Sequence, residues 1–122
     1  MPISYRIDAD ARLVRTVADG VLTDAELLAH KAQLAADPAF QAGMHQLSDV
    51  RGVERLDVSA DGVRSFVAHD AQHVERFAGH RMAIVASEAV VFGMARMYQT
   101  MSSVDVGVFR NIEDALAFLG KE

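Results

Sequence analysis

Two histidines and an aspartate stand close together in residues 69–73, which read HDAQH. On a helix, residues four apart lie on the same side, so His69 and His73 present both imidazoles together, as in the zinc-binding motif H-E-x-x-H. Asp70 stands where that motif has its glutamate. A zinc site needs three or four ligands, and the sequence indicates no third one here. The alternative is a solvated helix face without a metal, and we expect no cofactor.

Asp70 also interrupts an apolar helix face. The apolar residues at helical spacing around it are Val63, Phe66, Val67, Val74 and Phe77. A carboxylate in that position must be hydrogen-bonded, or must emerge where the helix end leaves the sheet. Burial would raise its pKa and suit it to acid or base chemistry. The alternatives are a pair with Arg64 or with a histidine, or exposure near the helix end.

A second polar group follows the predicted strands. Ligands of open α/β sheets bind beyond the carboxyl ends of parallel strands, and we expect Asp49, Arg51, Ser87 and Arg110 there. The arginines and the N–H groups of helix N-termini suit a small anion. The alternative is that Asp49 and Arg51 bond to each other and to turn amides while the serines only cap helices.

Composition narrows the function classes. The chain has 122 residues, enough for one domain over residues 1–122 with a core of its own. A net charge of −5 argues against nucleic-acid binding, and the lack of cysteine excludes disulfides and thiol catalysis. No apolar run is long enough to span a bilayer and the start does not resemble a signal peptide. We therefore expect a cytoplasmic protein.

Strand and helix signals alternate along the chain. Period-two strands at 3–7 and 12–18 predict a hairpin, and Thr23 with Glu26 caps a helix that ends before Pro38. Strands at 44–50, 81–87 and 104–109 alternate with helices at 59–77, 88–101 and 112–119, whose predicted caps are Ser59, Ser87 and Asn111. The order β-β-α-β-α-β-α-β-α predicts an α/β fold with a mixed sheet and helices packed on it.

The helix at 88–101 suggests a partner. The side expected to face the core holds Val90, Val91, Met94, Met97, Tyr98 and Met101. Phe92 falls on the other side with Arg96 and Gln99, a composition typical of an interface anchor, and predicts a homodimer or a protein partner. Alternatively the methionine-rich side lines a pocket for a lipid or another apolar ligand, because methionine adapts to irregular shapes.

Four stretches carry a family resemblance: RLVRTVADGVLTDAELLAH, DPAFQAGMHQLSDVRGVERLD, RMAIVASEAVVFGMARMYQTM and VGVFRNIEDALAFLG. They cover nearly the whole chain and resemble the small SpoIIAA-like proteins with STAS-type folds. In anti-anti-sigma members of the wider STAS group, a loop Asp-Ser-Ser-Gly carries a phosphorylated serine. The resemblance places Asp57 at the aspartate and Ser59 at the phospho-acceptor, with Val58 in place of the first serine.

Two classes of function remain. The first is a non-enzymatic regulatory or binding module of STAS type that acts through protein contacts. The second is a small enzyme that uses His69, Asp70 and His73, or Asp49 with Ser87. We favour the binding module, because the sequence shows no activated nucleophile, glycine-rich phosphate loop or complete metal set.

Overall fold

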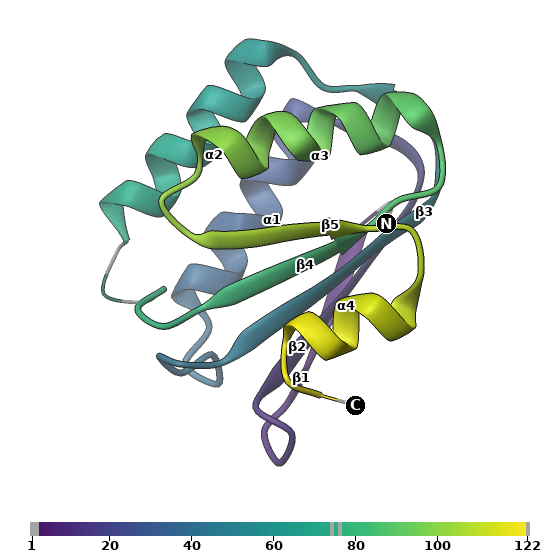
Figure 1. Cartoon of the computed structure of the whole chain (residues 1–122). Coiled ribbons are helices and arrows are strands. Elements are labelled where there is room, and N and C mark those ends of the chain that lie inside the picture. The colour runs from purple at the N-terminus through teal and green to yellow at the C-terminus, as the bar shows by residue number, and fades with distance from the viewer. Residues whose placement is uncertain (1–2, 74, 76, 122) are drawn as a thin grey trace.

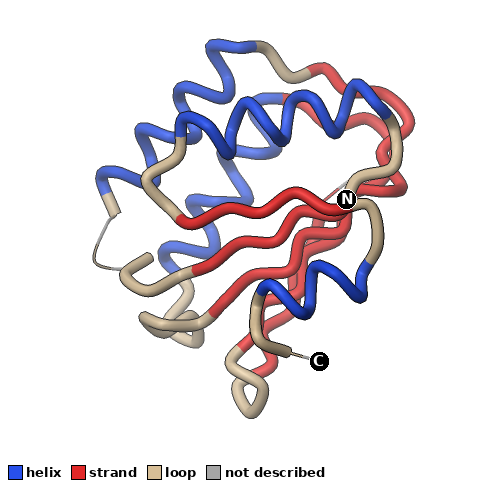
Figure 2. Tube along the Cα trace, in the orientation of Figure 1, coloured by secondary structure: helices blue, strands red, loops and turns tan. Residues whose placement is uncertain are grey.

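A single five-stranded sheet forms the centre of the molecule. The computed structural model describes residues 3–73, 75 and 77–121 (Figures 1 and 2). The elements in chain order are β1 (Ile3–Asp8), β2 (Leu13–Thr23), α1 (Asp24–Ala36), β3 (His45–Asp57), α2 (Ala60–Gln72), β4 (Arg81–Val85), α3 (Ala89–Met101), β5 (Asp105–Phe109) and α4 (Ile112–Phe118). The strand order is β1-β2-β3-β4-β5, with β1 antiparallel to β2 and the other neighbours parallel. The predicted element order and mixed sheet are confirmed.

Local sequence signals place most helix starts. Thr23 Oγ1 accepts the N–H of Glu26 at 3.2 Å, and Ser59 Oγ accepts the N–H of Gly62 at 2.9 Å. Asn111 Oδ1 accepts the N–H of Asp114 at 2.9 Å. These three predicted caps are confirmed. The predicted cap at Ser87 is wrong: α3 begins after Glu88, and the side chain of Glu88 makes no capping hydrogen bond.

Strand β3 is longer than the sequence pattern predicted. It pairs with β4 only as far as Asp49 and Val85, but it continues beside β2 to the pair of Thr23 with Asp57. Register shifts interrupt the β2–β3 ladder, and a Cβ built on Gly52 would lie 2.9 Å from Asp19 Cβ. The segment around Gly52 is therefore a bulged strand that lies tightly against β2, and the predicted end of the strand at residue 50 is wrong.

The two faces of the sheet carry different helices. Because side chains alternate along a strand, Leu47, Ala83 and Val85 face α4, and they pack there with Ala115 and Leu119. The opposite face packs against α1, α2 and α3, with Val63, Val91 and Tyr98 in the larger core cluster (Figure 1). Strand β4 lies between β3 and β5 and is covered on both faces, as its apolar run predicted.

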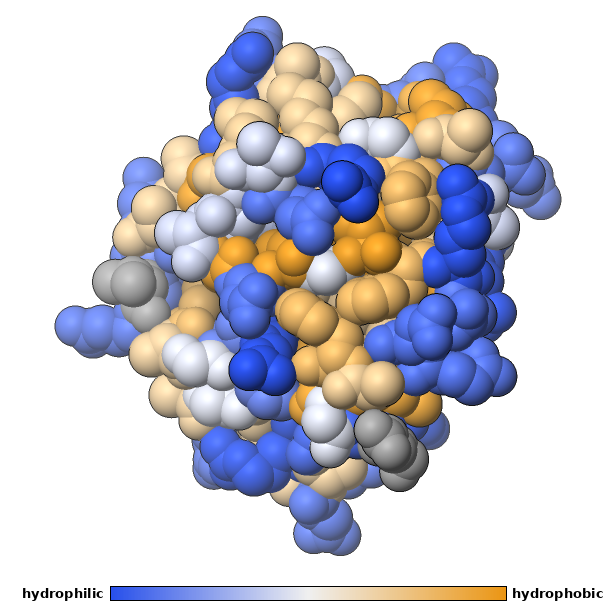
Figure 3. Space-filling view, viewed as in Figure 1, coloured by the Kyte–Doolittle hydropathy of each residue, from blue (hydrophilic) through white to orange (hydrophobic). Residues whose placement is uncertain are grey.

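Strand β5 is an edge of the sheet. Figure 3 shows apolar residues gathered in the middle of the face where β5 runs between α3 and α4, with hydrophilic residues around them. Gln99 Nε2 on α3 donates to the carbonyl of Val106 at 2.9 Å, so one carbonyl of this edge strand already accepts a hydrogen bond from a side chain. No helix in the described part of the chain has the length and apolar character needed to cross a bilayer.

Candidate functional site

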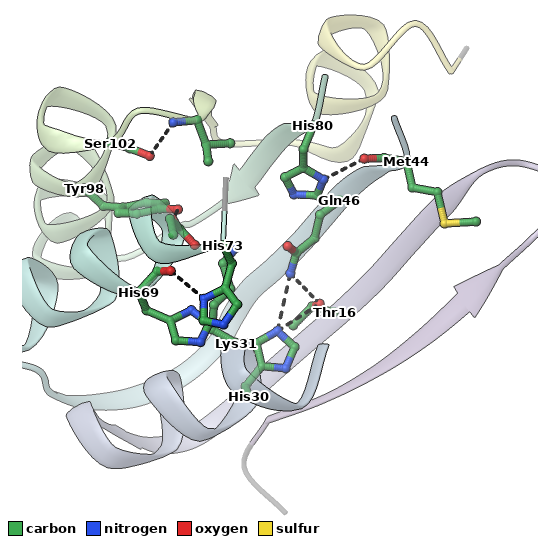
Figure 4. A network of polar contacts seen from close by, with 12 residues as sticks. Thr16, His30, Lys31, Met44, Gln46, His69, His73, His80, Tyr98 and Ser102 are labelled. Atoms are coloured by element: carbon green, nitrogen blue, oxygen red, sulfur yellow. Dashed lines mark hydrogen bonds and ion pairs between the residues drawn. The ribbon is translucent and has the colours of Figure 1, made fainter. Parts of the chain in front are cut away.

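An ion pair is buried between the three helices on one face of the sheet; Figure 4 shows its lysine, Lys31, and the nearby Tyr98. Lys31 Nζ on α1 lies 3.4 Å from Asp70 Oδ1 on α2, and both side chains are fully buried. Tyr98 on α3 donates its hydroxyl to Asp70 Oδ2 at 2.5 Å. Asp70 therefore joins all three helices through polar contacts that the surrounding apolar side chains shield from water.

Burial shifts the pKa of both residues that contact Asp70, Lys31 and Tyr98. Desolvation lowers the pKa of Lys31, and the charge of Asp70 opposes that shift. Desolvation also raises the pKa of Tyr98 well above its ordinary value, and the charge of Asp70 adds to that effect. The ammonium of Lys31 lies 4.4 Å from the ring centroid of Phe77 and 5.2 Å from that of Phe66. The rings supply part of the electrostatic stabilisation that water would supply at the surface.

A second set of buried polar groups lies between α1 and the sheet. Gln46 Nε2 on β3 donates to Thr16 Oγ1 at 2.8 Å, and His30 Nε2 lies 3.4 Å from Gln46 Nε2 and 3.5 Å from Thr16 Oγ1. Burial, together with the charge of Lys31, lowers the pKa of His30 to about 4. His30 is therefore neutral at physiological pH.

His80 is the third buried polar group on this side of the sheet. Its Nδ1 lies 2.6 Å from the carbonyl oxygen of Met44, and because a carbonyl only accepts, Nδ1 must carry the proton. Burial lowers the pKa of His80 to about 3, with a further contribution from Lys31. Phe40 and Phe77 pack against the ring at centroid distances of 5.5 Å and 5.4 Å. The ring is thus neutral and its Nε2 holds a lone pair.

Several atoms of these buried groups lack a hydrogen-bond partner among the described residues. They are Lys31 Nζ, Gln46 Oε1, His69 Nδ1, Asp70 Oδ1 and His80 Nε2. Buried polar atoms in proteins nearly always bond to protein, water or ligand, so such a concentration marks a place where hydrogen bonds remain to be made. We call Thr16, His30, Lys31, Gln46, Asp70, His80 and Tyr98 the buried polar cluster.

The histidine pair is placed differently from a metal site. The rings of His69 and His73 stack at 4.2 Å between centroids, and His73 Nδ1 donates to the carbonyl of His69 at 2.9 Å. Asp70 points away from both, toward Lys31. Among the described residues, no group of three or more histidines and acids is placed to hold a metal ion. The pair has no further ligand in that part of the chain.

The predicted partners of Asp70 are wrong. Arg64 donates to Asp61 at 2.6 Å on the surface, whereas Asp70 meets Lys31 and Tyr98. The predicted exposure near the helix end is also wrong, since Asp70 is 1% exposed. The apolar face around it holds Val63 and Phe66 as predicted, while Val74 lies outside the described residues.

The four residues predicted beyond the strand ends lie near one another, but Asp49 and Arg51 are inside β3, beside the carboxyl end of β4, and not beyond the end of their own strand. Asp49 pairs in register with Val85 at the carboxyl end of β4, and Arg110 directly follows β5. Asp49 accepts two side-chain hydrogen bonds from Arg51, each 2.9 Å long, which lowers the pKa of Asp49. Arg110 donates to the carbonyl of Ser87 at 3.2 Å. We call Asp49, Arg51, Ser87 and Arg110 the strand-end rim; an anion there remains a prediction, and both arginines already have partners.

Ser59 lies apart from that rim. The strand from Asp49 to Asp57 spans roughly 25 Å of extended chain, so Ser59 sits near the far end of the long β2–β3 ladder. Its hydroxyl donates to Asp24 Oδ2 at 2.7 Å, and its N–H donates to Asp24 Oδ1 at 2.9 Å. The predicted neighbour Asp57 instead accepts from Arg55 at 3.2 Å. Ser59 thus connects the N-termini of α1 and α2.

An apolar pocket lies between α2 and α3. Its free volume is about 80 Å³, and its lining is apolar apart from the hydroxyl of one tyrosine: Leu22, Leu27, Val50, Leu56, Val58, Val63, Phe66, Ile84, Val91, Met94, Ala95 and Tyr98. Leu27, Leu56 and Met94 are only partly buried, so the pocket reaches the surface. It shares Tyr98 with the buried polar cluster.

Helix α3 is rotated relative to the prediction. Val91 and Tyr98 are buried as expected, but Val90, predicted to lie in the core, is 66% exposed. Phe92 was predicted to be exposed; it is half-buried, and its ring centroid lies 4.4 Å from the guanidinium carbon of Arg110. Gln99 is bonded to β5 and Arg96 is exposed. The homodimer remains a prediction, but Phe92 is not a free anchor for it.

Of the buried polar cluster, the sequence predictions gave a functional role to Asp70 alone; the other six members are Thr16, His30, Lys31, Gln46, His80 and Tyr98. Lys31 follows Leu27 by four residues and precedes Leu34 by three, so its position on an apolar helix face was a usable signal. Asp70 on α2 and Lys31 on α1 are both charged residues on apolar helix faces, and an ion pair between them compensates the cost of burying each charge.

The arrangement of strands and helices matches a known structure. A search of solved structures finds a crystal structure of an uncharacterized protein from the DUF3478 family with a SpoIIAA-like fold, from Shewanella loihica PV-4. The TM-score is 0.63 at 18% sequence identity, over 96% of this chain and 93% of that chain. No protein-family model and no curated protein matches the sequence. This chain therefore has the SpoIIAA-like α/β fold that the resemblance implied, and the likeness concerns the fold alone.

Proposed function

We propose that this protein is a non-enzymatic binding module of STAS type whose ligand is an apolar molecule held between α2 and α3. The apolar pocket between these helices is the observation that supports the proposal. Burial of each methylene group from water contributes about 0.8 kcal/mol, so an apolar lining selects acyl chains and similar molecules. The lining offers such a ligand one polar contact at most, the hydroxyl of Tyr98, which already donates to Asp70.

The pocket must widen when a ligand enters. Its volume of about 80 Å³ is below the roughly 300 Å³ that begins the usual range of ligand pockets. Met94 is partly buried at the pocket, and its unbranched side chain adopts new rotamers more readily than a branched one. Movement of Met94 and of other partly buried side chains at the pocket, such as Leu27 and Leu56, provides the additional room.

A pair of size-matched substitutions tests the apolar site. Ala95→Phe fills the pocket between α2 and α3, whereas Ala68→Phe adds the same ring to an exposed position of α2. We expect a fluorescent fatty-acid probe to bind the wild-type protein and Ala68→Phe alike, and to lose at least tenfold in affinity for Ala95→Phe. Equal affinity for all three proteins, or no binding by the wild type, contradicts the proposal.

Self-association through α3 is the second part of the proposal. Val90 and Met101 are 66% and 36% exposed, and Gly93 and Met97 lie on the same side of the helix. A Cβ on Gly93 would meet no atom within 4 Å, so packing inside the chain does not require this glycine. A glycine inside a helix costs about 1 kcal/mol relative to alanine. Gly93 would allow the α3 helix of a second copy to pack closely against this one, because glycine has no side chain to keep the two backbones apart.

Sedimentation at increasing concentration tests self-association. Gly93→Leu places a side chain on the exposed stripe without a clash inside the chain, and we expect it to shift a wild-type dimer toward monomer. Ala68→Leu on the exposed side of α2 is the control and should leave the dimer intact. Phe92 is unsuitable for this test, since it packs against the core. A wild-type protein that remains monomeric at high concentration rules out this part of the proposal.

A further inference from the structure

A polar pocket opens at the amino ends of β4 and β5, the end of these strands opposite the strand-end rim. Its volume is about 440 Å³, and its walls come from the segments that lead into the two strands, residues 77–81 and 103–105, together with Asp70. The apolar pocket lies on the other side of Tyr98, whose hydroxyl bonds to Asp70. The two pockets are therefore separate sites that meet at one hydrogen bond.

Asp70 lines this pocket and has one carboxylate oxygen without a hydrogen bond among the described residues. The side chain is fully buried, and Oδ2 already accepts from Tyr98. The other oxygen, Oδ1, has the ion pair with Lys31 at 3.4 Å but no hydrogen-bond partner among the described residues. A charged oxygen so deeply buried accepts strongly from any donor that reaches it.

His80 brings a second acceptor. Its Nδ1–H is used by the carbonyl of Met44, so Nε2 can only accept. His80 lines the pocket, is 3% exposed, and its Nε2 has no partner in the described part of the chain. The rings of Phe40 and Phe77 hold the imidazole in place from two sides. The orientation of this acceptor is thus determined before any ligand arrives.

Among the described residues that line the pocket, the charged side chains are paired. Asp70 is neutralised by Lys31, and Asp105 at the pocket wall lies 3.4 Å from Arg81. A cation would meet the ammonium of Lys31 behind Asp70, and an anion would be repelled by the two buried acceptor atoms, Asp70 Oδ1 and His80 Nε2. The arrangement favours a neutral molecule that supplies hydrogen-bond donors.

We infer that this pocket binds a small neutral polyhydroxy molecule, whose hydroxyl groups donate to Asp70 Oδ1 and His80 Nε2. The exposed Ser103 and the pair of Arg81 with Asp105 lie at the same pocket and offer further polar contacts to such a ligand. The ring of Phe77 forms an apolar wall against which the carbon face of a polyol can pack. The inference is independent of the apolar ligand between α2 and α3.

Nuclear magnetic resonance of the histidine ring nitrogens tests the inference directly. Glycerol, D-ribose and myo-inositol are titrated into ¹⁵N-labelled protein well into the millimolar range, with ethylammonium and acetate as charged probes. We expect at least one polyol to shift the His80 Nε2 resonance saturably, and the charged probes to leave it unmoved. No saturable shift with any of the three polyols, or a shift with a charged probe alone, overturns the inference.

Two phenylalanine variants locate the binding. His80→Phe keeps a ring between Phe40 and Phe77 but removes the acceptor, and we expect polyol affinity to fall at least tenfold. His69→Phe removes another ring nitrogen that has no hydrogen-bond partner among the described residues and belongs to a residue outside the pocket lining, and it should bind as the wild type does. Equal affinity of His80→Phe and wild type overturns the inference. If His80→Phe fails to fold, the wild-type ring-nitrogen shift still decides the question.

Discussion

The strand-end rim and the buried polar cluster use similar side chains in opposite ways. At the rim, Asp49 lies partly exposed and accepts two short hydrogen bonds from Arg51. In the cluster, Asp70 is fully buried, and its ion pair with Lys31 leaves an acceptor and a donor without hydrogen bonds among the described residues. The side chains of the rim form hydrogen bonds with each other and are open to solvent. In the cluster, several buried atoms have no hydrogen-bond partner among the described residues, so they need a water molecule or a ligand.

The difference shows why the cluster is the better candidate site. Charged side chains at strand ends and helix starts arise wherever caps and turns are needed, and solvent weakens their interactions. A buried charge destabilises the fold unless ion pairs and hydrogen bonds compensate for its lost hydration. Such a charge therefore indicates either compensating contacts or a functional role. Disturbing the cluster should therefore cost more stability than disturbing partly exposed polar groups such as helix caps.

Acid should destabilise the protein through the cluster. The pKa values of His30 and His80 are lowered to about 4 and about 3, against about 6.5 in an unfolded chain. Below pH 6.5 these two histidines become protonated in the unfolded chain but stay neutral in the folded protein. The unfolding free energy that is present above pH 6.5 is therefore lost as the pH falls toward 4. The loss approaches about 1.4 kcal/mol per pH unit for each histidine.

Urea unfolding at a series of pH values measures this effect. His30→Gln should remove one of the two contributions and flatten the pH dependence of the unfolding free energy accordingly. A stability that is constant from pH 6.5 to pH 5 in the wild type contradicts the burial of neutral histidines.

Removal of Lys31 should be the most damaging single substitution. Lys31→Met keeps much of the side-chain length but leaves Asp70 buried without its counter-charge, and we expect a loss of about 3–5 kcal/mol in unfolding free energy. The double variant Lys31→Met with Asp70→Leu should recover most of that loss, since no unpaired charge remains. Urea unfolding of the single and double variants checks both statements. A loss below about 1 kcal/mol in the single variant would show that Asp70 does not need Lys31.

The hydroxyl of Tyr98 should contribute less than the ion pair. Tyr98→Phe preserves the stack on Phe66, whose centroid lies 5.0 Å away, and removes only the hydrogen bond to Asp70. We expect a loss of about 1.5–3 kcal/mol, typical of a hydrogen bond to a charged group. Tyr5→Phe is the matched control: its hydroxyl donates to Asp37 at 2.7 Å in a half-buried place, and its loss should cost less. Thermal or urea unfolding that ranks the two variants the other way contradicts the assignment.

The cap at Ser59 should have the smallest effect. Ser59→Ala removes the N-cap of α2 and the bond to Asp24, with an expected cost of about 1 kcal/mol. Asn111→Ala at the N-terminus of α4 should cost a similar amount by urea unfolding.

Phosphorylation of Ser59 remains a prediction of the family resemblance. A phosphate there would face the carboxylate of Asp24 and separate the N-termini of α1 and α2. Mass spectrometry of protein from its native cells, under several growth conditions, checks the modification; persistent absence of phosphate counts against it.

Local residue order was sufficient for most of the fold. The strand and helix order, the hairpin, the central position of β4 and the caps at Thr23, Ser59 and Asn111 all follow from periodicity and from hydrogen bonds within a few residues. Such features depend on neighbours in the chain, so the pattern of neighbours predicts them.

The remaining features, among them the length of β3, the rotation of α3 and the buried polar cluster, depend on contacts between segments that are distant in the chain. The length of β3 depends on β2, which pairs with it beyond the end of β4, and the rotation of α3 depends on which side packs on the sheet. Asp70 was visible as an anomaly on α2, but Tyr98 lies 28 residues away along the chain, and Lys31 comes from yet another helix. Burial in a shared interior turns these scattered side chains into one cluster, because only there does each polar group need the others.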